Sequence, residues 1–344
     1  YGRQGECNFM SNAEITVPAR AASQYDDLLK QKKKNKRKAD FKRLLPLYLM
    51  MLPGLVYLLC NNYLPMFGLV LAFKNYKISA GKSFVYSLFH SEWAGLDNFS
   101  FFLKSNQFAT ILRNTLLYNI VFIILGIVLP VGLAIMINNI YSKRKSKTYQ
   151  TMMFLPHFMS WVVISYFVYA FLSPDRGLMN SILQGMGKDP VRWYSEAKYW
   201  PYILVFMQVW KTLGYNMVVY LASITGIDTS LYEAAVLDGA SKMQQARYIT
   251  LPSLKPIIIM MFILSVGRIF SSDFGLFYQV TRGVPGSLAK VATTFDVYIF
   301  NALQTGVPLG RTAAASFFQA VVGCITILIA NWIVRRVDRE SALI

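Results

Sequence analysis

Apolar residues in this chain are gathered into six long runs that polar segments separate. The runs cover residues 46–73, 108–140, 152–172, 200–225, 256–280 and 314–334. Each run is long enough to cross a membrane, since a transmembrane helix needs about 20 mostly apolar residues. The pattern therefore predicts an all-α, polytopic membrane protein with six transmembrane helices.

The polar segment at residues 233–252, EAAVLDGASKMQQARYITLP, lies between the fourth and fifth runs. Its composition places it at the membrane surface rather than in the bilayer. Ser230 and Glu233, three residues apart, fit a capping box at the start of a first short helix. Asp238 and Gly239 are expected to break that helix, because glycine accepts backbone conformations that other residues resist.

A second cap pattern follows directly after this break. Ser241 and Gln244 have the same three-residue spacing and predict the start of a second helix. Pro252 is expected to end it, since proline disfavours the α conformation in the residue before it. The segment is thus predicted to fold as a helix, a sharp turn and a second helix.

This segment resembles the EAA loop of binding-protein-dependent ABC importer permeases. The matching positions are Glu233, Ala234, Ala235, Gly239, Ile249, Leu251 and Pro252. In that family the loop is the coupling helix that docks into a groove on the ATPase subunit. The resemblance assigns the ATPase contact to Glu233, Ala234, Ala235, Asp238, Gly239 and Ala240. The alternative is an amphipathic turn that only links two spans.

Other segments resemble the carbohydrate-uptake branch of the same family. They are residues 95–99 followed by 114–116, residues 177–180 with Trp193, and the late run 294–313. Residues 161–180 and 267–280 are similar to a subgroup assigned to oligosaccharide or polysaccharide uptake. The resemblance covers the chain from about residue 45 onward and implies the type I ABC importer permease fold.

The resemblance also implies the partners of the chain. They are a second permease subunit that forms a heterodimer with this chain, a dimer of ATP-binding subunits, an extracytoplasmic solute-binding protein and a carbohydrate substrate. ATP and Mg²⁺ would be held by the ATPase, so no cofactor is expected on this chain. The chain itself would transmit force and shape the path of the substrate.

Composition and charge agree with a membrane protein. Hydrophobic residues make up 55% of the 344 residues and the mean hydropathy is +0.38, whereas soluble domains are usually about 45–50% apolar. The formal net charge of +18 is spread over short runs that flank the apolar segments, as membrane insertion requires. This distribution argues against a nucleic-acid partner.

The densest basic run, KQKKKNKRKADFKR at residues 30–43, precedes the first apolar run. It predicts a basic N-terminal tail at residues 1–44 and a transmembrane permease domain at residues 45–344, with the coupling loop at 226–253. Basic residues favour the cytoplasmic side, which predicts that both termini lie in the cytoplasm. The family resemblance implies that the spans lie in a bacterial plasma membrane. Alternatively the tail binds anionic membrane lipid, at about 1 kcal/mol per basic residue.

Candidate substrate contacts lie in the third, fourth and fifth runs. A sugar needs aromatic platforms for its CH faces and hydrogen-bonding groups for its hydroxyls. Arg268 stands inside the fifth run, where a guanidinium costs about 2.5–3.5 kcal/mol unless it faces a polar cavity or a partner. The candidate residues for the substrate path are Trp161, Tyr166, Trp210, Tyr220, Arg268 and Asp273.

Each of these residues has a structural alternative. Aromatic side chains also form belts at membrane interfaces and pack between helices. Arg268 is as consistent with a pairing to Asp273, or to the second permease, as with substrate contact. An acidic substrate would favour the contact with Arg268.

Catalytic chemistry has little support in the sequence. The phosphate-binding motif G-x-x-x-x-G-K-[ST] is incomplete, because Tyr76 stands where its first glycine belongs. The histidines and cysteines are far apart in sequence: His90, His157, Cys7, Cys60 and Cys324. We therefore expect no catalytic residue, no metal site and no enzymatic activity on this chain.

The sequence predicts the transmembrane permease subunit of an ABC importer that moves an oligosaccharide or polysaccharide fragment into the cell. ATP would be hydrolysed by a separate subunit. The first alternative is an importer of the same class for an amino acid, a peptide or a phosphate compound. The second is an integral membrane glycosyltransferase, which would need a carboxylate cluster at a membrane face. The third is a secondary transporter, which would normally contain an internal repeat of several spans.

Overall fold

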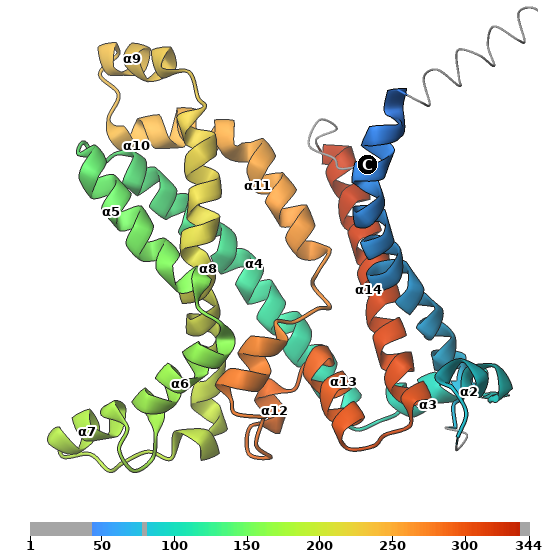
Figure 1. Cartoon of the computed structure of the whole chain (residues 1–344). Coiled ribbons are helices and arrows are strands. Elements are labelled where there is room, and N and C mark those ends of the chain that lie inside the picture. Colours follow the sequence, from blue (N-terminus) through green and yellow to red (C-terminus); the bar gives the residue numbers. More distant parts are fainter. Residues whose placement is uncertain (1–42, 78–80, 338–344) are drawn as a thin grey trace, which may run out of the picture. The chain divides into compact units, whose positions relative to one another are not determined.

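The computed structural model describes residues 43–77 and 81–337. The predicted tail at residues 1–44 lies outside them except for its last two residues, as does the end of the chain from residue 338. The described chain is mostly helical (Figure 1), with one small sheet in which β1 (Lys74–Asn75) pairs antiparallel with β2 (Glu92–Trp93). It forms two compact units, divided in sequence between Phe67 and Gly68.

The first unit holds most of the first span. A helix covers Arg43–Phe73, and its later part is π-helical in η1 (Leu59–Tyr63) and 3₁₀-helical in η2 (Leu64–Phe73). The helix matches the predicted run at residues 46–73. All side chains at residues 43–67 are exposed, which agrees with an apolar helix in a membrane environment.

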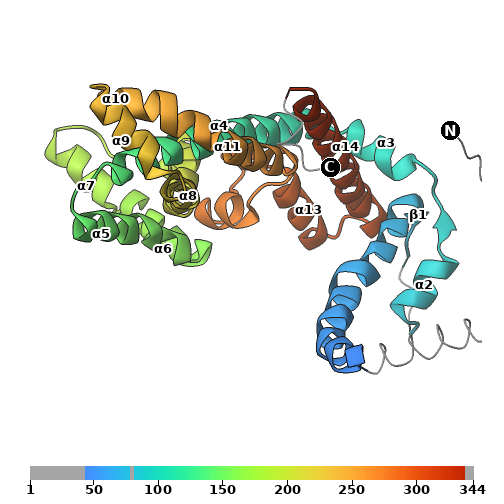
Figure 2. The ribbon, with the colours of Figure 1, turned by 90° about the horizontal axis from the view of Figure 1, so that it is seen from above.

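Two long helices form the centre of the second unit, α4 (Phe108–Asn138) and α8 (Trp200–Thr225). They pack along each other, and a buried cluster joins Val131 of α4 to Met217 and Tyr220 of α8. α8 has its predicted bounds, and α4 ends two residues before the predicted end of its run at residue 140. In both Figure 1 and Figure 2, α5 (Lys143–Phe154) and α11 (Leu251–Val266) lie on opposite sides of α8.

The third run, predicted as one helix over residues 152–172, is bent instead. α5 continues into η3 (Leu155–Phe158), and α6 (Trp161–Leu172) then starts at 98° to the preceding helix. The Ser160 hydroxyl caps α6 by accepting a hydrogen bond from the Val163 N–H at 3.3 Å.

The bend is stabilised from another helix. The Lys211 ammonium of α8 donates to the carbonyl oxygens of His157, at 3.2 Å, and of Met159. These carbonyls lie where the helix is interrupted and would otherwise lack partners. The prediction of a straight span was wrong because apolar periodicity does not reveal a partner 52 residues further along the chain.

The fifth run was predicted at residues 256–280, and the structure corrects both of its ends. One helix runs over Lys242–Val266, made of α10 (Lys242–Gln245), the π-helical η6 (Ala246–Thr250) and α11. Pro252 lies in the first turn of α11 and does not end the helix. The π-helical register of η6 accommodates a proline that an uninterrupted α-helix would resist.

Beyond Val266 the fifth run becomes irregular and resumes as the π-helical η7 (Gly275–Val280). Asn119 of α4 donates to the carbonyl oxygens of Ile269, at 2.9 Å, and Ser271, at 3.0 Å. Gln319 donates to the Phe270 carbonyl oxygen at 2.9 Å. Irregular backbone at membrane depth is tolerated where protein groups satisfy it or where it lines a polar cavity.

Gln319 belongs to α14 (Leu309–Val337), which extends past both ends of the predicted sixth run at residues 314–334. At the lower end of the second unit in Figure 1 lie α7 (Leu178–Gly185), α12 (Ala289–Ala292) and α13 (Phe295–Gln304). The remaining short elements are α2 (Phe84–His90), α3 (Asp97–Leu103), η4 (Trp193–Ser195) and η5 (Ala197–Tyr199).

By length and hydropathy, four described helices can cross a membrane: Arg43–Phe73, Phe108–Asn138, Lys242–Val266 and Leu309–Arg336. The bent pair Lys143–Phe158 and Trp161–Leu172 is a fifth candidate if it counts as one span. α8 has the length, but its aromatic, amide and lysine side chains lower its hydropathy. The six-span prediction therefore stays a prediction in its exact count.

Candidate functional site

The predicted coupling loop begins with α9 (Thr229–Leu237), which lies with α10 at the upper end of the second unit in Figure 1. Its N-cap is Asp228, whose Oδ1 accepts a hydrogen bond from the Ser230 N–H at 2.9 Å. The choice of Ser230 as the cap was wrong by two residues, because a carboxylate accepts stronger hydrogen bonds than a hydroxyl. This bond to the backbone lowers the pKa of Asp228 below its ordinary value.

The predicted break at Gly239 is confirmed. Gly239 has a φ of +76°, in the left-handed region that favours glycine. Its N–H donates to the Val236 carbonyl oxygen at 3.0 Å, and the Ala240 N–H donates to the Ala235 carbonyl oxygen at 2.8 Å. These two bonds form a Schellman motif, which satisfies the last carbonyls of α9 and turns the chain sharply.

The second cap of the loop is also confirmed. The Ser241 hydroxyl accepts from the Gln244 N–H at 3.3 Å, and the Gln244 side chain accepts from the Ser241 N–H at 2.7 Å. The hydroxyls of Tyr232 in α9 and Thr250 in η6 lie 2.9 Å apart and form a hydrogen bond. The loop is therefore fastened to the helix that leaves it.

The predicted contact residues differ in their exposure. Glu233, Ala234, Asp238 and Gly239 are exposed, and Ala235 and Ala240 are half-buried. Two apolar side chains that the sequence reasoning missed, Leu237 and Met243, are 89% and 78% exposed. Exposed apolar side chains on a polar loop are typical of an interaction surface, and their place in a short polar segment was the available signal.

A polar cavity of about 440 Å³ lies between α4, α8, α11 and the irregular segment after Val266. Three of the predicted substrate-path residues line it, Tyr220, Arg268 and Asp273. The polar residues among its other lining residues are Asn119, Gln208, Thr212, Tyr215, Asn216, Ser265, Ser271 and Ser272. Arg268 therefore lines a polar cavity, one of the two environments expected for it, and its role in the substrate path stays a prediction.

Asp273 is held by N–H groups. Its Oδ2 accepts from the indole N–H of Trp161 at 2.6 Å, and its Oδ1 accepts from the backbone N–H groups of Gly275, at 3.0 Å, and Leu276, at 3.3 Å. Within the described residues no ion pair of 4.0 Å or less joins Arg268 to Asp273. The structure thus brings Trp161 to Asp273 and leaves the guanidinium facing the cavity.

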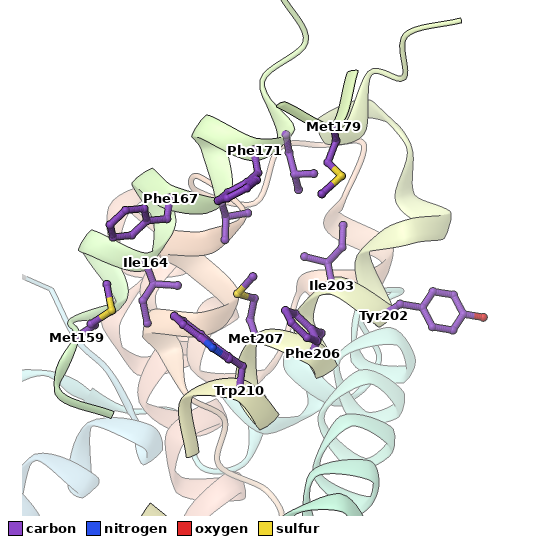
Figure 3. A pocket seen from close by; sticks show the side chains of 12 residues that line it. Met159, Ile164, Phe167, Phe171, Met179, Tyr202, Ile203, Phe206, Met207 and Trp210 are labelled. Atoms are coloured by element: carbon purple, nitrogen blue, oxygen red, sulfur yellow. The ribbon is translucent and has the colours of Figure 1, made fainter. Parts of the chain in front are cut away.

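The two other predicted path residues lie elsewhere. Tyr166 is 68% exposed on α6. Trp210 lines a separate, apolar pocket of about 680 Å³ formed by α6, α7 and α8 (Figure 3). In Figure 3, Trp210, Met207 and Phe206 line the α8 side of this pocket, whereas the ring of Tyr202 points away from it.

Sequence reasoning missed the amide residues of the polar cavity. Asn119, Gln208 and Asn216 come from α4 and α8, and only their position within apolar runs could have marked them. Gln208 Oε1 and the Tyr220 hydroxyl are buried and have no hydrogen-bond partner within the described chain. These two unsatisfied groups belong to residues that line a cavity able to hold water or a polar ligand.

The outer motif at residues 177–180 has a structural role. Asn180 is buried, and its amide donates to the Pro174 and Val191 carbonyl oxygens at 3.0 Å. Its Oδ1 accepts from the Val191 N–H and from the indole N–H of Trp193, both at 3.0 Å. Asn180 therefore holds the segment between α6 and α8 together.

Residues 126–339 match the family described as binding-protein-dependent transport system inner membrane component. The polygalacturonan/rhamnogalacturonan transport system permease protein YteP of Bacillus subtilis (strain 168) is 31% identical to this chain, over 96% of this chain and 99% of YteP.

Two alginate transporter structures are among the solved structures similar to this chain. One, of a bacterial ABC transporter involved in the import of the acidic polysaccharide alginate, has a TM-score of 0.78 and 33% identity, covering 88% of this chain and 99% of that one. The other, of a bacterial alginate ABC transporter in complex with an alginate pentasaccharide-bound periplasmic protein, has a TM-score of 0.76 and 33% identity, covering 87% and 97%. This chain belongs to the family of inner-membrane components of binding-protein-dependent transport systems, which are membrane permeases of ABC transporters and not enzymes.

Proposed function

We propose that this chain is the permease subunit of an ABC importer that moves an oligosaccharide or polysaccharide fragment into the cell. The observation that carries the proposal is the helix Lys242–Val266. It starts in the coupling loop, contributes Met261 and Ser265 to the lining of the polar cavity, and ends two residues before Arg268. A displacement of the loop is thereby transmitted to the wall of the cavity.

The force comes from a separate dimer of ATP-binding subunits, which holds ATP and Mg²⁺, and this chain carries no cofactor. The contact with that dimer is formed by the six predicted residues of the loop, Glu233, Ala234, Ala235, Asp238, Gly239 and Ala240. The exposed side chains of Leu237 and Met243 add apolar area to the same surface. The Schellman turn keeps α9 and α10 in a defined relation, so the loop moves as one piece.

The similar proteins support the kinds of cargo and partner proposed here. YteP is described as a polygalacturonan/rhamnogalacturonan permease, and the two similar structures belong to alginate importers. A carbohydrate cargo delivered by an extracytoplasmic binding protein is proposed for this chain on that basis. A second permease subunit is proposed to complete the cavity, because Arg268 and Asp273 line it and are nevertheless exposed in this single chain.

The chain is proposed to lie in the bacterial plasma membrane with both termini and the coupling loop in the cytoplasm. α9 and α10 occupy one end of the second unit, and α7, α12 and α13 the other (Figure 1). The basic residues of α5, which follows the second span, support a cytoplasmic position for the end that carries the coupling loop.

The experiment is purification of the chain from its host in mild detergent, together with uptake of saccharides by cells that carry it. We expect an ATPase and a second permease to co-purify. Glu233→Arg should remove the ATPase and abolish uptake while the chain still inserts. Glu92→Arg, an exposed glutamate in β2 outside the loop, is the matched control and should keep the ATPase.

Two results would contradict the proposal. Wild-type uptake by Glu233→Arg would remove the coupling role of the loop. Co-purification of the transporter parts with uptake of an amino acid, a peptide or a phosphate compound, but of no saccharide, would replace the cargo while leaving the permease role in place.

A further inference from the structure

Arg268 is the one cation among the described residues that line the polar cavity. Asp273, the one anion there, has both carboxylate oxygens engaged by the N–H groups of Trp161, Gly275 and Leu276. A further cation, the ammonium of Lys211, lies 5.2 Å from the centroid of the Trp161 ring. The carboxylate of Asp273 is therefore stabilised by several N–H donors and not by an ion pair with Arg268.

A second carboxylate near the irregular segment is occupied in the same way. Asp296 Oδ2 accepts from the Ser272 N–H at 2.6 Å and from the Ser272 hydroxyl at 2.8 Å, and its Oδ1 accepts from the Gln319 amide at 3.3 Å. Both carboxylates thus serve the fold of the segment that carries Arg268. No ion pair in the described chain neutralises the guanidinium.

An unpaired guanidinium in a membrane-spanning region is costly, and such residues in membrane proteins mark substrate pathways or subunit contacts. Two residues that line the cavity also carry buried hydrogen-bonding groups without a partner in the described chain, Gln208 Oε1 and the Tyr220 hydroxyl. Tyr220 is fully buried. A cavity lined by one cation together with amide and hydroxyl side chains suits a ligand that carries both hydroxyls and a negative charge.

We propose that this cavity selects an acidic oligosaccharide, and that Arg268 binds a carboxylate of its uronate rings. The proposal rests on the proposed importer function and adds the chemical class of the cargo. A guanidinium offers two parallel N–H donors that match a carboxylate. The volume of about 440 Å³ lies within the usual range of ligand sites, about 300–1,000 Å³.

The test compares two ligands that differ only in charge: a galacturonate trisaccharide and the same trisaccharide with its carboxyl groups reduced to alcohols. Equilibrium binding is measured on the whole transporter, with its second permease and ATPase, without the binding protein. Any preference for the charged ligand measured in this way comes from the transporter itself and not from the binding protein. The variants are Arg268→Gln, Arg268→Lys and, as a control for loss of an exposed cation outside the cavity, Lys104→Gln.

We expect the wild type and Lys104→Gln to bind the acid at least about tenfold more tightly than the reduced ligand, which is about 1.4 kcal/mol. Arg268→Gln should lose this preference and keep its affinity for the reduced ligand. Arg268→Lys should keep part of the preference, because lysine retains the positive charge but lacks the two parallel N–H donors of the guanidinium.

Three results would overturn the inference: equal or undetectable binding of the two ligands by the wild type, a preference that survives in Arg268→Gln, or loss of the second permease from that variant. The last would assign Arg268 to the subunit contact. A wild-type chain that purifies without an ATPase would instead refute the proposed function, so the two failures are distinguishable.

Discussion

The indole N–H of Trp161 donates to Asp273 Oδ2 at 2.6 Å, across 112 positions of sequence. Trp161 is the first residue of α6 after the 98° bend, and Asp273 lies just before η7 after the irregular segment. One hydrogen bond therefore joins the two places where the third and fifth apolar runs are interrupted. α6 and η7 also pack against each other, so the two interruptions form one structural unit beside the cavity.

Trp161→Phe should weaken this unit without unfolding the chain. The substitution keeps an aromatic ring but removes the donor, and hydrogen bonds to charged groups contribute about 1.5–3 kcal/mol. We expect a lower thermal unfolding temperature of the purified transporter and slower uptake. A double-mutant cycle with Asp273→Asn measures the coupling, and additive effects of the two substitutions would argue against a functional link.

Gly239→Pro should uncouple the loop. Proline holds φ near about −65° and has no N–H, whereas Gly239 has a φ of +76° and donates to the Val236 carbonyl oxygen. We expect normal insertion, loss of the co-purifying ATPase and loss of uptake. Gly239→Asn is the matched control, because asparagine tolerates the left-handed region and keeps the N–H. Normal uptake by the proline variant would show that the turn is dispensable.

Gly214→Val should disturb the contact between α8 and α5. A Cβ at Gly214 would overlap the backbone carbonyl of Met153, and backbone cannot move aside as a side chain can. Overpacking of this kind costs about 1–3 kcal/mol, so we expect lower yield and a lower unfolding temperature. Gly132→Val in α4 has open space around its Cβ and should be tolerated. Equal stability of the two variants would contradict the close approach of α8 to α5.

Asn180→Asp should loosen the outer segment between α6 and α8. The carboxylate loses the two donors to the Pro174 and Val191 carbonyls and places a charge in a buried position. Each unsatisfied buried group costs about 1–3 kcal/mol. Limited proteolysis of membranes should cut this segment faster in Asn180→Asp than in the wild type. Asn139→Asp, an exposed residue at the end of α4, should not change the cleavage rate.

Asp228 makes the stability of α9 depend on acid pH. Its pKa in the folded loop is lowered by the Ser230 N–H, relative to about 3.9 in an unfolded chain. The cap is therefore fully present above the unfolded value and is lost as the pH falls through the folded value. Hydrogen exchange of α9 should be slower in the wild type than in Asp228→Ala at neutral pH, and this difference should shrink at acid pH. A difference independent of pH would exclude the carboxylate as its cause.

Much of this architecture was predictable because its causes are local in sequence. The apolar runs marked α4 and α8 and most of the first and sixth spans, since a membrane helix must be apolar over its length. The loop was predicted from spacing, because the turn at Gly239 and the cap formed by Ser241 and Gln244 involve residues a few positions apart. The errors at Ser230 and Pro252 also have local causes. Asp228, two residues before Ser230, forms the N-cap, and the π-helical η6 accommodates Pro252.

Only the tertiary structure decided where the third and fifth runs are interrupted and which polar residues meet. The backbone carbonyls at these interruptions accept hydrogen bonds from the side chains of Lys211, Asn119 and Gln319. Each of these side chains lies far in sequence from the carbonyls it binds. The same distances explain why Arg268, Asp273 and Tyr220 share a cavity with unpredicted amides, while Tyr166 and Trp210 do not. The sequence by itself determined which segments are apolar enough to enter the membrane. The packing of α4, α8, α11 and α14 determined where those segments break, because a break is stable only when another helix satisfies its backbone.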